Sequence, residues 1–404
     1  MTGIVIVGAG QAGGTAALQL RAAGFEGDVA LIGAEPHPPY ERPPLSKAYL
    51  TGELTYESLL LRPAELYEAQ RIRLLTDTSI ASIDLAQHSV STSDARVLPF
   101  DKLLLATGAR PRQLPVSGAD LPGAHYLRTL ADVAALQNTM QRAQRVCLIG
   151  GGYVGLEFAS VARKAGLHVT VLESADRLLQ RVTTPEMSQY FADLHRSHGV
   201  EVCCGAKIHE LQGTDCVERV VCEHGDVEAD LVLIGIGAIP NIELAEAAGL
   251  TCENGIQVDE HCRSSHPDVF AAGDCTNHPN TLLNRRLRLE SAPNATDQAR
   301  VAAANMMGGE ESYCTVPWFW SDQYASKLQA VGFSSDGTES ICRGDKASHQ
   351  FAVFYLNENR LVAVEAVNSA KAFMAGKRLY GQELNPELLA DPNVDLRSLV
   401  KSVA

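Results

Sequence analysis

The chain has 404 residues, of which 46% are hydrophobic and 20% charged, so it can bury a large core and should form two or three domains. Its 34 Lys and Arg residues are outnumbered by 48 Asp and Glu residues, and the net charge of -14 repels phosphate backbones and argues against nucleic-acid binding. No run approaches the roughly 18 apolar residues that span a bilayer, and no basic leader precedes the apolar residues that begin at Gly3. We expect a cytoplasmic protein without a nucleic-acid or membrane partner.

The first predicted unit consists of an apolar strand at 3–7, a glycine turn, an Ala-rich helix and a second strand that ends near Glu35. The turn contains Gly8, Gly10 and Gly13 in the spacing G-x-G-x-x-G. The first glycine makes the turn, the second lets the backbone approach a pyrophosphate, and the third lets helix pack on strand. Glu35 is placed to accept hydrogen bonds from ribose hydroxyls. The pattern predicts a dinucleotide-binding βαβ unit.

The same pattern returns 142 residues further along, counted from Gly8 to Gly150. The glycines of this second unit are Gly150, Gly152 and Gly155. Glu173 ends its second strand, where an acid accepts hydrogen bonds from an unmodified ribose and repels a 2′-phosphate. Glu173 therefore favours NADH over NADPH, although Arg177 and Arg181 nearby leave that preference open.

Two shorter apolar strands each end in a turn of small residues. The strand at 103–105 leads to Ala106, Thr107 and Gly108, and the strand at 268–272 leads to Gly273 and Asp274. Gly273 allows the backbone close to a ligand, and Asp274 can accept a hydrogen bond from a ribityl or ribose hydroxyl. Further along, 351–355 and 361–365 predict paired strands around a turn at 357–359.

The cysteines and histidines show no pattern that requires a metal. The ten cysteines have no C-x-x-C or other close metal-ligand spacing, and we expect most of them to be small buried hydrophobic residues in a reducing compartment. His195 and His198 stand three apart on a predicted helix without a cluster of carboxylates beside them. We expect both histidines to face solvent, and no metal site is predicted.

Together, the two G-x-G-x-x-G turns, the Ala-Thr-Gly segment and the late Gly-Asp resemble, in order and over essentially the whole chain, the two-dinucleotide flavoprotein reductases of the glutathione-reductase fold. These enzymes form part of the pyridine nucleotide-disulfide oxidoreductase superfamily. The resemblance implies an α/β fold with two Rossmann-like dinucleotide-binding domains, one for FAD and one for NAD, and a C-terminal α+β domain. It places the FAD-binding domain at 1–110 and 240–315, the NADH-binding domain at 111–239, and a C-terminal interface domain, similar to reductase dimerisation domains, at 316–404.

The segment after the first ribose acid separates the branches of that superfamily. Disulfide reductases carry C-x-x-x-x-C there, whereas the first cysteine of this chain is Cys147, so a redox disulfide is not expected. The segments YERPPLSK at 40–47 and PWFWSDQY at 317–324 instead resemble those of NADH-specific ferredoxin reductases that serve bacterial Rieske oxygenases and haem-thiolate monooxygenases. The resemblance implies hydride transfer from NADH to FAD and release of single electrons to a [2Fe-2S] ferredoxin, because flavin converts between two-electron and one-electron chemistry.

The same resemblance implies roles for individual residues. Lys47 would lie beside the flavin and pair with Glu157, Glu157 would contact the nicotinamide amide, and Trp320 would neighbour the flavin; these three are the candidate catalytic residues. The candidate FAD ligands are Gly8, Gly10, Gly13, Glu35, Arg42, Lys47, Ala106, Thr107, Gly108, Gly273, Asp274 and Trp320, and the candidate NADH ligands are Gly150, Gly152, Gly155, Glu157 and Glu173. Three alternatives stay open. In the first, the Arg-Pro-Pro turn only shapes its loop and Lys47 projects into solvent. In the second, Glu157 is favoured only by the helix dipole, and in the third the tryptophans belong to a core aromatic cluster.

An acidic ferredoxin would seek local positive charge on this acidic chain. The densest basic cluster is Arg285, Arg286 and Arg288, with Lys371, Lys377 and Arg378 as further candidates, and the alternative is a solvated face. Two rival functions stay open. One is a monodehydroascorbate-type or other NADH-dependent flavin reductase, and the other, from a different class, is a flavin-bound signalling protein like apoptosis-inducing factor.

Overall fold

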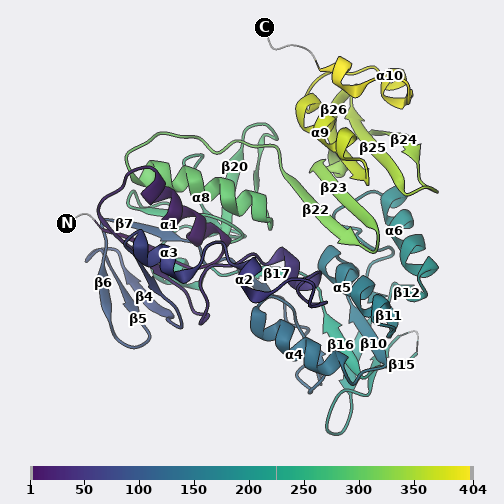
Figure 1. The fold of residues 1–404 in the computed structure, drawn as a ribbon, viewed down its shortest axis with the longest axis horizontal. Coiled ribbons are helices and arrows are strands. Elements are labelled where there is room, and N and C mark those ends of the chain that lie inside the picture. Colours follow the sequence, from purple (N-terminus) through teal and green to yellow (C-terminus); the bar gives the residue numbers. More distant parts are fainter. Residues whose placement is uncertain (1–2, 224, 401–404) are drawn as a thin grey trace. The chain divides into compact units, whose positions relative to one another are not determined.

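The computed structural model describes residues 3–223 and 225–400, and its chain divides into two units (Figure 1). Unit 1 consists of the residues up to Pro44 together with Leu54–Arg110 and Ala238–Thr315, and unit 2 consists of Leu45–Glu53, Pro111–Gly237 and the residues from Val316 onward. Within the described residues, no helix combines the length and the apolar character needed to cross a membrane.

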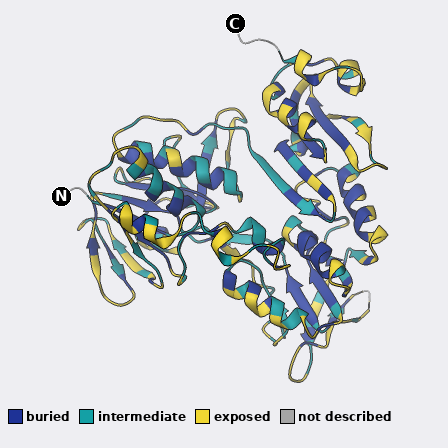
Figure 2. Ribbon diagram, viewed as in Figure 1, coloured by how far each residue is buried: buried dark blue, intermediate teal, exposed yellow. Residues whose placement is uncertain are grey.

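Unit 1 is built on a five-stranded sheet whose neighbouring strands all run parallel. In spatial order the strands are β19 (Val269–Ala271), β7 (Lys102–Leu105), β1 (Gly3–Val7), β2 (Asp28–Ile32) and β3 (Ile72–Leu75). The central strands are continuous apolar runs, because a parallel sheet of this kind is covered on both faces. Figure 2 shows these strands buried beneath more exposed helices.

Helices cover one face of this sheet, and a second sheet covers the other. On the first face α1 (Gln11–Ala22) and α8 (Ala292–Met306) lie side by side, and alanines such as Ala16 and Ala299 let them approach closely (Figure 1). The opposite face packs against the antiparallel strands β4 (Ile80–Asp84), β5 (Ser89–Thr92) and β6 (Val97–Pro99). The remaining elements are α2 (Tyr56–Leu59), α3 (Ala64–Ala69), β8 (Ala109–Pro111), β17 (Ala238–Pro240), α7 (Glu243–Ala247), β18 (Ile256–Gln257), β20 (Thr276–Asn280) and β21 (Arg285–Leu287).

Unit 2 contains a second parallel sheet of five strands. In spatial order these are β12 (Val200–Cys204), β11 (His168–Glu173), β10 (Arg145–Ile149), β16 (Leu231–Ile234) and β9 (Ala124–His125). The helices of this part are α4 (Leu130–Met140), α5 (Tyr153–Lys164) and α6 (Pro185–Ser197), and a small antiparallel sheet contains β13 (Ile208–Gln212), β14 (Arg219–Cys222) and β15 (Val227–Glu228). The short 3-10 helix η1 (Pro43–Ser46) includes the first two residues of the segment Leu45–Glu53.

The C-terminal part of unit 2 is an antiparallel sheet with helices against it. Its strands, in spatial order, are β22 (Trp318–Gln323), β23 (Ser326–Gly332), β26 (Arg360–Val367), β25 (Gln350–Asn357) and β24 (Glu339–Asp345), and its helices are η2 (Ser334–Asp336), α9 (Ala370–Leu379), α10 (Pro386–Ala390) and η3 (Leu396–Leu399). The predicted hairpin is confirmed, since Asn357 pairs with Arg360 and positive φ angles at Glu358 and Asn359 make a two-residue turn. Two parallel sheets and a C-terminal antiparallel sheet confirm the predicted fold class.

The expectation that most cysteines are buried is wrong. All ten are free thiols, but the buried ones are only Cys147, Cys222, Cys262 and Cys275. Cys203 and Cys204 are half-buried, because β12 stands at the edge of its sheet and has a covering neighbour on one side only. Residue type alone does not report whether a strand is central or at an edge.

Candidate active site

Three of the predicted FAD segments meet in unit 1 because their strands are neighbours. Gly8 follows β1, Ala106 follows β7 and Gly273 comes shortly after β19, and the carboxyl ends of adjacent parallel strands lie at the same edge of the sheet. The contact is close, since a Cβ added to Gly8 would lie 2.1 Å from the carbonyl oxygen of Ala106. Gly8 also has a φ of +111°, which side chains rarely adopt.

Asn241 fixes the turn after β7, and sequence analysis missed it. The hydroxyl of Thr107 donates to the carbonyl oxygen of Asn241 at 2.6 Å, and the Asn241 side-chain amide donates to the carbonyl oxygen of Thr107 at 2.9 Å. The backbone N–H of Asn241 also donates to the carbonyl oxygen of Gly108 at 2.9 Å. Its only local signal in the sequence is that a polar residue directly follows Pro240. That pattern is too common to identify a residue that fixes a turn.

Arg42 links the acidic residues predicted at the FAD site. Its guanidinium lies 2.6 Å from a carboxylate oxygen of Glu35, and the Tyr40 hydroxyl donates to the other oxygen at 2.5 Å. Burial lowers the pKa of Arg42, but the charges of Tyr40, Glu35 and Asp274 outweigh burial, so the pKa ends above its ordinary value. In unit 1, the two predicted acids, Glu35 and Asp274, therefore both stabilise the positive charge of Arg42.

The second glycine of each turn faces open space, which is where a pyrophosphate would fit. A Cβ added to Gly10 or to Gly152 would meet no described atom within 4 Å, so no protein contact in the described chain requires glycine there. Each glycine precedes the first turn of α1 or α5, and neither caps its helix through a side chain. Unpaired N–H groups and the helix dipole at such an end favour an anion. Both turns fit the dinucleotides that the sequence predicts.

Glu173 stands beside the second turn in unit 2. Its carboxylate accepts hydrogen bonds from the backbone N–H of Gly151 at 2.6 Å and of Ala175 at 2.8 Å. These bonds fix the carboxylate at the carboxyl end of β11, next to the turn that follows β10. The turn itself is held by a close approach, because a Cβ on Gly150 would lie 2.4 Å from the carbonyl oxygen of Gly235.

Glu157 is a buried carboxylate surrounded by donors, all of them in unit 2. It lies on α5 and is 4% exposed. Lys47 Nζ lies 3.1 Å from Oε1, the Ser46 hydroxyl donates to Oε2 at 2.6 Å, and the Ser321 hydroxyl donates to Oε1 at 2.7 Å. Burial raises the pKa of Glu157, while Lys47 and then Ser46 and Ser321 oppose that rise. The pairing with Lys47 is present, but the two serines were not singled out from sequence.

Lys47 also lies near an aromatic pair on β22. Its side chain is only 16% exposed, so it does not project into solvent. Its Nζ lies 5.8 Å from the ring centroid of Trp320, and Asp322 Oδ2 lies 3.8 Å away. Trp320 is 5.7 Å from the ring of Trp318. The structure thus brings the three candidate catalytic residues together, and their roles towards a flavin stay predictions.

The expectation that His195 faces solvent is wrong, whereas His198 is exposed. His195 is fully buried, with Nε2 2.9 Å from Oε1 of Gln323 and Nδ1 3.2 Å from the Tyr324 hydroxyl. It lies one helical turn after Phe191 on the apolar face of α6, and that four-residue spacing was the available signal. Burial lowers the pKa of His195 to about 4.

The basic cluster at 285–288 is partly occupied by its own unit. Arg286 donates to the carbonyl oxygens of Val258 at 2.7 Å and Asn277 at 2.5 Å. Arg288 pairs with Glu290, and its side chain is 16% exposed. Arg285 is exposed. A docking role for these arginines stays a prediction.

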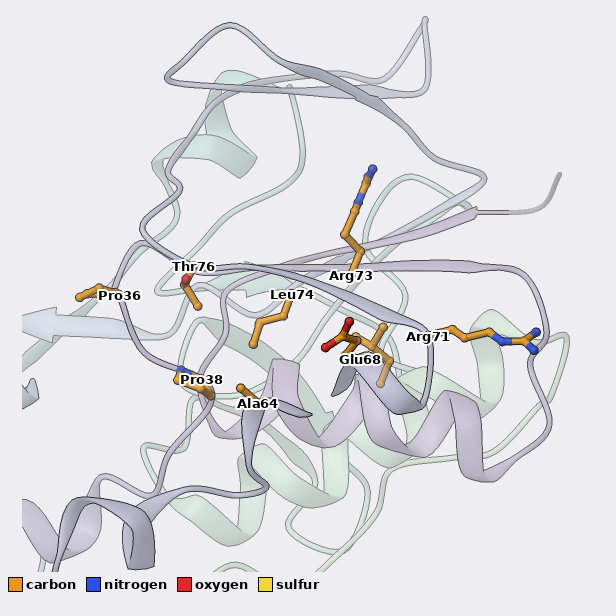
Figure 3. A pocket seen from close by; sticks show the side chains of 9 residues that line it. Pro36, Pro38, Ala64, Glu68, Arg71, Arg73, Leu74 and Thr76 are labelled. Atoms are coloured by element: carbon orange, nitrogen blue, oxygen red, sulfur yellow. The ribbon is translucent and has the colours of Figure 1, made fainter. Parts of the chain in front are cut away.

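Two other features of unit 1 carry no role here. A surface pocket of about 650 Å³ lies beside the edge strand β3, lined by residues such as Pro36, Leu74 and Thr76, and none of the candidate site residues lines it (Figure 3). Among the described residues, His88, His266 and Asp268 place one ligand atom each within 4.8 Å of one another. Asp268 is already bound by the ammonium of Lys102 at 2.5 Å, and that positive charge opposes a cation.

Comparisons with known proteins agree with this geometry. Residues 2–299 match the family described as pyridine nucleotide-disulphide oxidoreductase, and residues 318–400 match the one described as reductase C-terminal. The chain is 44% identical over 398 residues to rhodocoxin reductase from Rhodococcus erythropolis, covering 98% of this chain and 93% of that protein. Among solved structures, the ferredoxin reductase for the CYP199A2 system from Rhodopseudomonas palustris has a TM-score of 0.96 at 40% identity, covering 99% and 100% of the two chains. A chain of the covalent putidaredoxin reductase-putidaredoxin complex has a TM-score of 0.95 at 43% identity, covering 98% of each.

Proposed function

This chain belongs to the pyridine nucleotide-disulphide oxidoreductase family, and we propose that it is an FAD-dependent NADH:ferredoxin reductase that passes single electrons to a [2Fe-2S] ferredoxin of a Rieske oxygenase or haem-thiolate monooxygenase. The observation that carries the proposal is the ion pair between Lys47 and the buried Glu157, which lies on α5 just after the second glycine turn. Full-length likeness to ferredoxin reductases, one of them solved in covalent complex with putidaredoxin, supports the choice of acceptor.

Unit 1 supplies the glycine turn and the acidic residues that would hold FAD. When bound, FAD accepts two electrons together from NADH and releases them singly. The turn at Gly8–Gly13 would receive the pyrophosphate on the first N–H groups of α1. Glu35 and Asp274 would accept hydrogen bonds from ribose and ribityl hydroxyls, with Arg42 holding their charge in place. The candidate residue Gly273 lies at the same sheet edge.

Unit 2 supplies the residues that would hold NADH. The turn at Gly150–Gly155 would receive its pyrophosphate, and Glu173, already oriented by two backbone N–H groups, would accept bonds from the ribose and repel a 2′-phosphate. Glu157 would accept a hydrogen bond from the nicotinamide amide. Lys47, held by Glu157, would place a positive charge where negative charge develops during reduction.

The acceptor is tested with the purified holoprotein and NADH. Cytochrome c is offered with and without a [2Fe-2S] ferredoxin, and ascorbate radical is offered in a parallel reaction. We expect cytochrome c reduction to depend on the ferredoxin and to saturate with its concentration. Rapid turnover of the radical without ferredoxin would instead identify a monodehydroascorbate-type reductase, and it would overturn the proposal.

We also propose a cytoplasmic location. All ten cysteines are free thiols, including the exposed Cys216 and Cys342. Exposed thiols persist in a reducing compartment, whereas oxidising compartments favour disulfides.

A further inference from the structure

Four buried side chains in unit 2 form a line of hydrogen bonds from α6 to Glu157. His195 Nε2 lies 2.9 Å from Oε1 of Gln323, Gln323 Nε2 donates to the Ser321 hydroxyl at 3.2 Å, and that hydroxyl donates to Glu157 Oε1 at 2.7 Å. His195, Gln323 and Ser321 are fully buried, and Glu157 is 4% exposed. Water therefore does not compete for these bonds.

The line has one direction because an amide has two different ends. The Gln323 oxygen can only accept, so the hydrogen between it and His195 must belong to His195 Nε2. The Gln323 nitrogen can only donate, so Ser321 accepts from it. Ser321 then has its single hydrogen available for Glu157. Every donor in the line points towards the carboxylate.

The far end of the line fixes which nitrogen of His195 carries the proton. Burial lowers the pKa of His195 to about 4, so the ring is neutral near pH 7 and has one N–H. The Tyr324 hydroxyl lies 3.2 Å from Nδ1, and burial raises the pKa of Tyr324, so Tyr324 keeps its proton and can donate it to Nδ1. The N–H of His195 is thereby left at Nε2, facing Gln323. His198 stacks on Tyr324 at 3.7 Å from outside the line.

We propose that His195 and Gln323 are positioning residues that keep Ser321 a donor to Glu157, and so keep this buried carboxylate ionised for the reaction with NADH. The inference deepens the proposed function and rests on it. Without His195, nothing in the line orients the Gln323 amide, which can turn its oxygen towards Ser321. Ser321 would then donate to Gln323, and Glu157 would lose one of its donors.

The loss would matter because burial already opposes the charge on Glu157. Burial raises its pKa, and the opposing groups are Lys47 and Ser46 from the segment Leu45–Glu53 and Ser321 from β22. Asp322 on β22 faces Lys47 at 3.8 Å and weakens that cation's effect. On α5 itself, the Tyr153 hydroxyl is buried, and its pKa is raised by burial, then by Glu365 and Glu157, so it stays neutral. Removal of a donor therefore raises the pKa of Glu157 further.

The test compares His195→Leu with His195→Gln, whose side-chain amide can replace the Nε2 donor. The rate of flavin reduction by NADH is followed by stopped flow across pH in the holoprotein. In His195→Leu we expect the acid limb of the pH profile to move to higher pH by about one unit, which is the scale of one lost hydrogen bond to a charge. At pH values below that limb, flavin reduction should be about tenfold slower than in the parent protein. His195→Gln should restore the profile. The matched control is His209→Ala, at an exposed histidine on β13 outside the line, with an unchanged profile.

Several outcomes would contradict the positioning role. An unshifted pH profile in His195→Leu overturns it. An equal slowing of flavin reduction in His195→Leu and His195→Gln also overturns it, because that result would show a loss of packing and not of a hydrogen bond. Where His195→Leu fails to fold with FAD, Gln323→Met breaks the same line and should move the limb in the same direction.

A second readout separates this inference from the proposed function. The carboxyl band of Glu157, identified by its loss in Glu157→Gln, is titrated by infrared spectroscopy of the oxidised holoprotein without NADH. We expect its midpoint to rise in His195→Leu, and an unmoved midpoint overturns the positioning role. Failure of the parent protein to oxidise NADH would instead count against the proposed function.

Discussion

Glu157 shows how a carboxyl group can be surrounded by donors inside a protein. Its carboxylate is almost without contact to water, yet a lysine and two serine hydroxyls stand within hydrogen-bond distance. Breaking a buried ion pair by removing one partner is costly, because the other charge stays behind unpaired. Lys47 and Glu157 are therefore expected to depend on each other.

Replacement of Lys47 by alanine tests that dependence. We expect Lys47→Ala to retain FAD, because the FAD turns lie in unit 1, and to slow flavin reduction by NADH by roughly a hundredfold, the scale of losing one preorganised donor. Stopped-flow reduction and the ratio of flavin to protein absorbance measure the two effects. Lys102→Ala, which removes a lysine paired with Asp268 in unit 1, is the control. An unchanged rate in Lys47→Ala would remove Lys47 from the mechanism.

Sequence reasoning reached this cluster only in part. Lys47 and Glu157 came from the resemblance of short segments, which local sequence can carry. Ser46 and Ser321 lie 111 and 164 residues from Glu157 along the chain, and no local pattern relates them to it. His195 was misread because its partner, Gln323, lies on a strand of the C-terminal sheet that only the folded chain brings to α6.

At the level of elements, the glycine turns show what a short pattern can predict. Glycine spacing between a predicted strand and a predicted helix indicated both turns, because the requirements of a strand-to-helix turn are local. It did not separate glycines needed by the protein from those needed by a ligand. Gly8 is forced by the carbonyl oxygen of Ala106, whereas Gly10 and Gly152 face open space in the described chain.

That difference predicts distinct effects for two single-methyl changes. We expect Gly10→Ala to fold with unchanged or slightly higher thermal stability as apoprotein, since φ is -92° and no described atom is near, but to bind FAD more than about tenfold more weakly. Gly152→Ala should instead purify with full FAD and raise the KM for NADH. Equilibrium dialysis, apoprotein melting and steady-state kinetics measure these effects. Full FAD affinity in Gly10→Ala would mean that no pyrophosphate approaches this turn.

At the scale of the whole molecule, net charge affects the approach of a protein partner. The net charge of -14 repels an acidic ferredoxin at long range, so docking requires a local positive surface. The sequence indicated a cluster of three arginines. In the structure Arg286 and Arg288 already have partners within unit 1, which composition cannot reveal.

The docking prediction is tested at Arg285, which is exposed. We expect Arg285→Glu to raise the KM for ferredoxin a few-fold at low salt, since exposed ion pairs contribute up to about 1 kcal/mol, and the difference from the parent should shrink as salt rises. Cytochrome c reduction through the ferredoxin measures both. Arg300→Glu, an equal charge change at an exposed position on α8, is the control. If the two variants showed the same salt dependence, the change in KM would come from overall charge and not from a specific docking surface.

The segment Leu45–Glu53 belongs to unit 2, although unit 1 flanks it on both sides in the chain. It brings Lys47 to Glu157, and Gln137 on α4 donates to the carbonyl oxygen of Leu50 at 3.0 Å. If a genetic exchange between relatives transferred only the contiguous stretch Pro111–Gly237, it would transfer Glu157 without the Lys47 that pairs with it. The coding regions of the two units are thus interleaved in the gene.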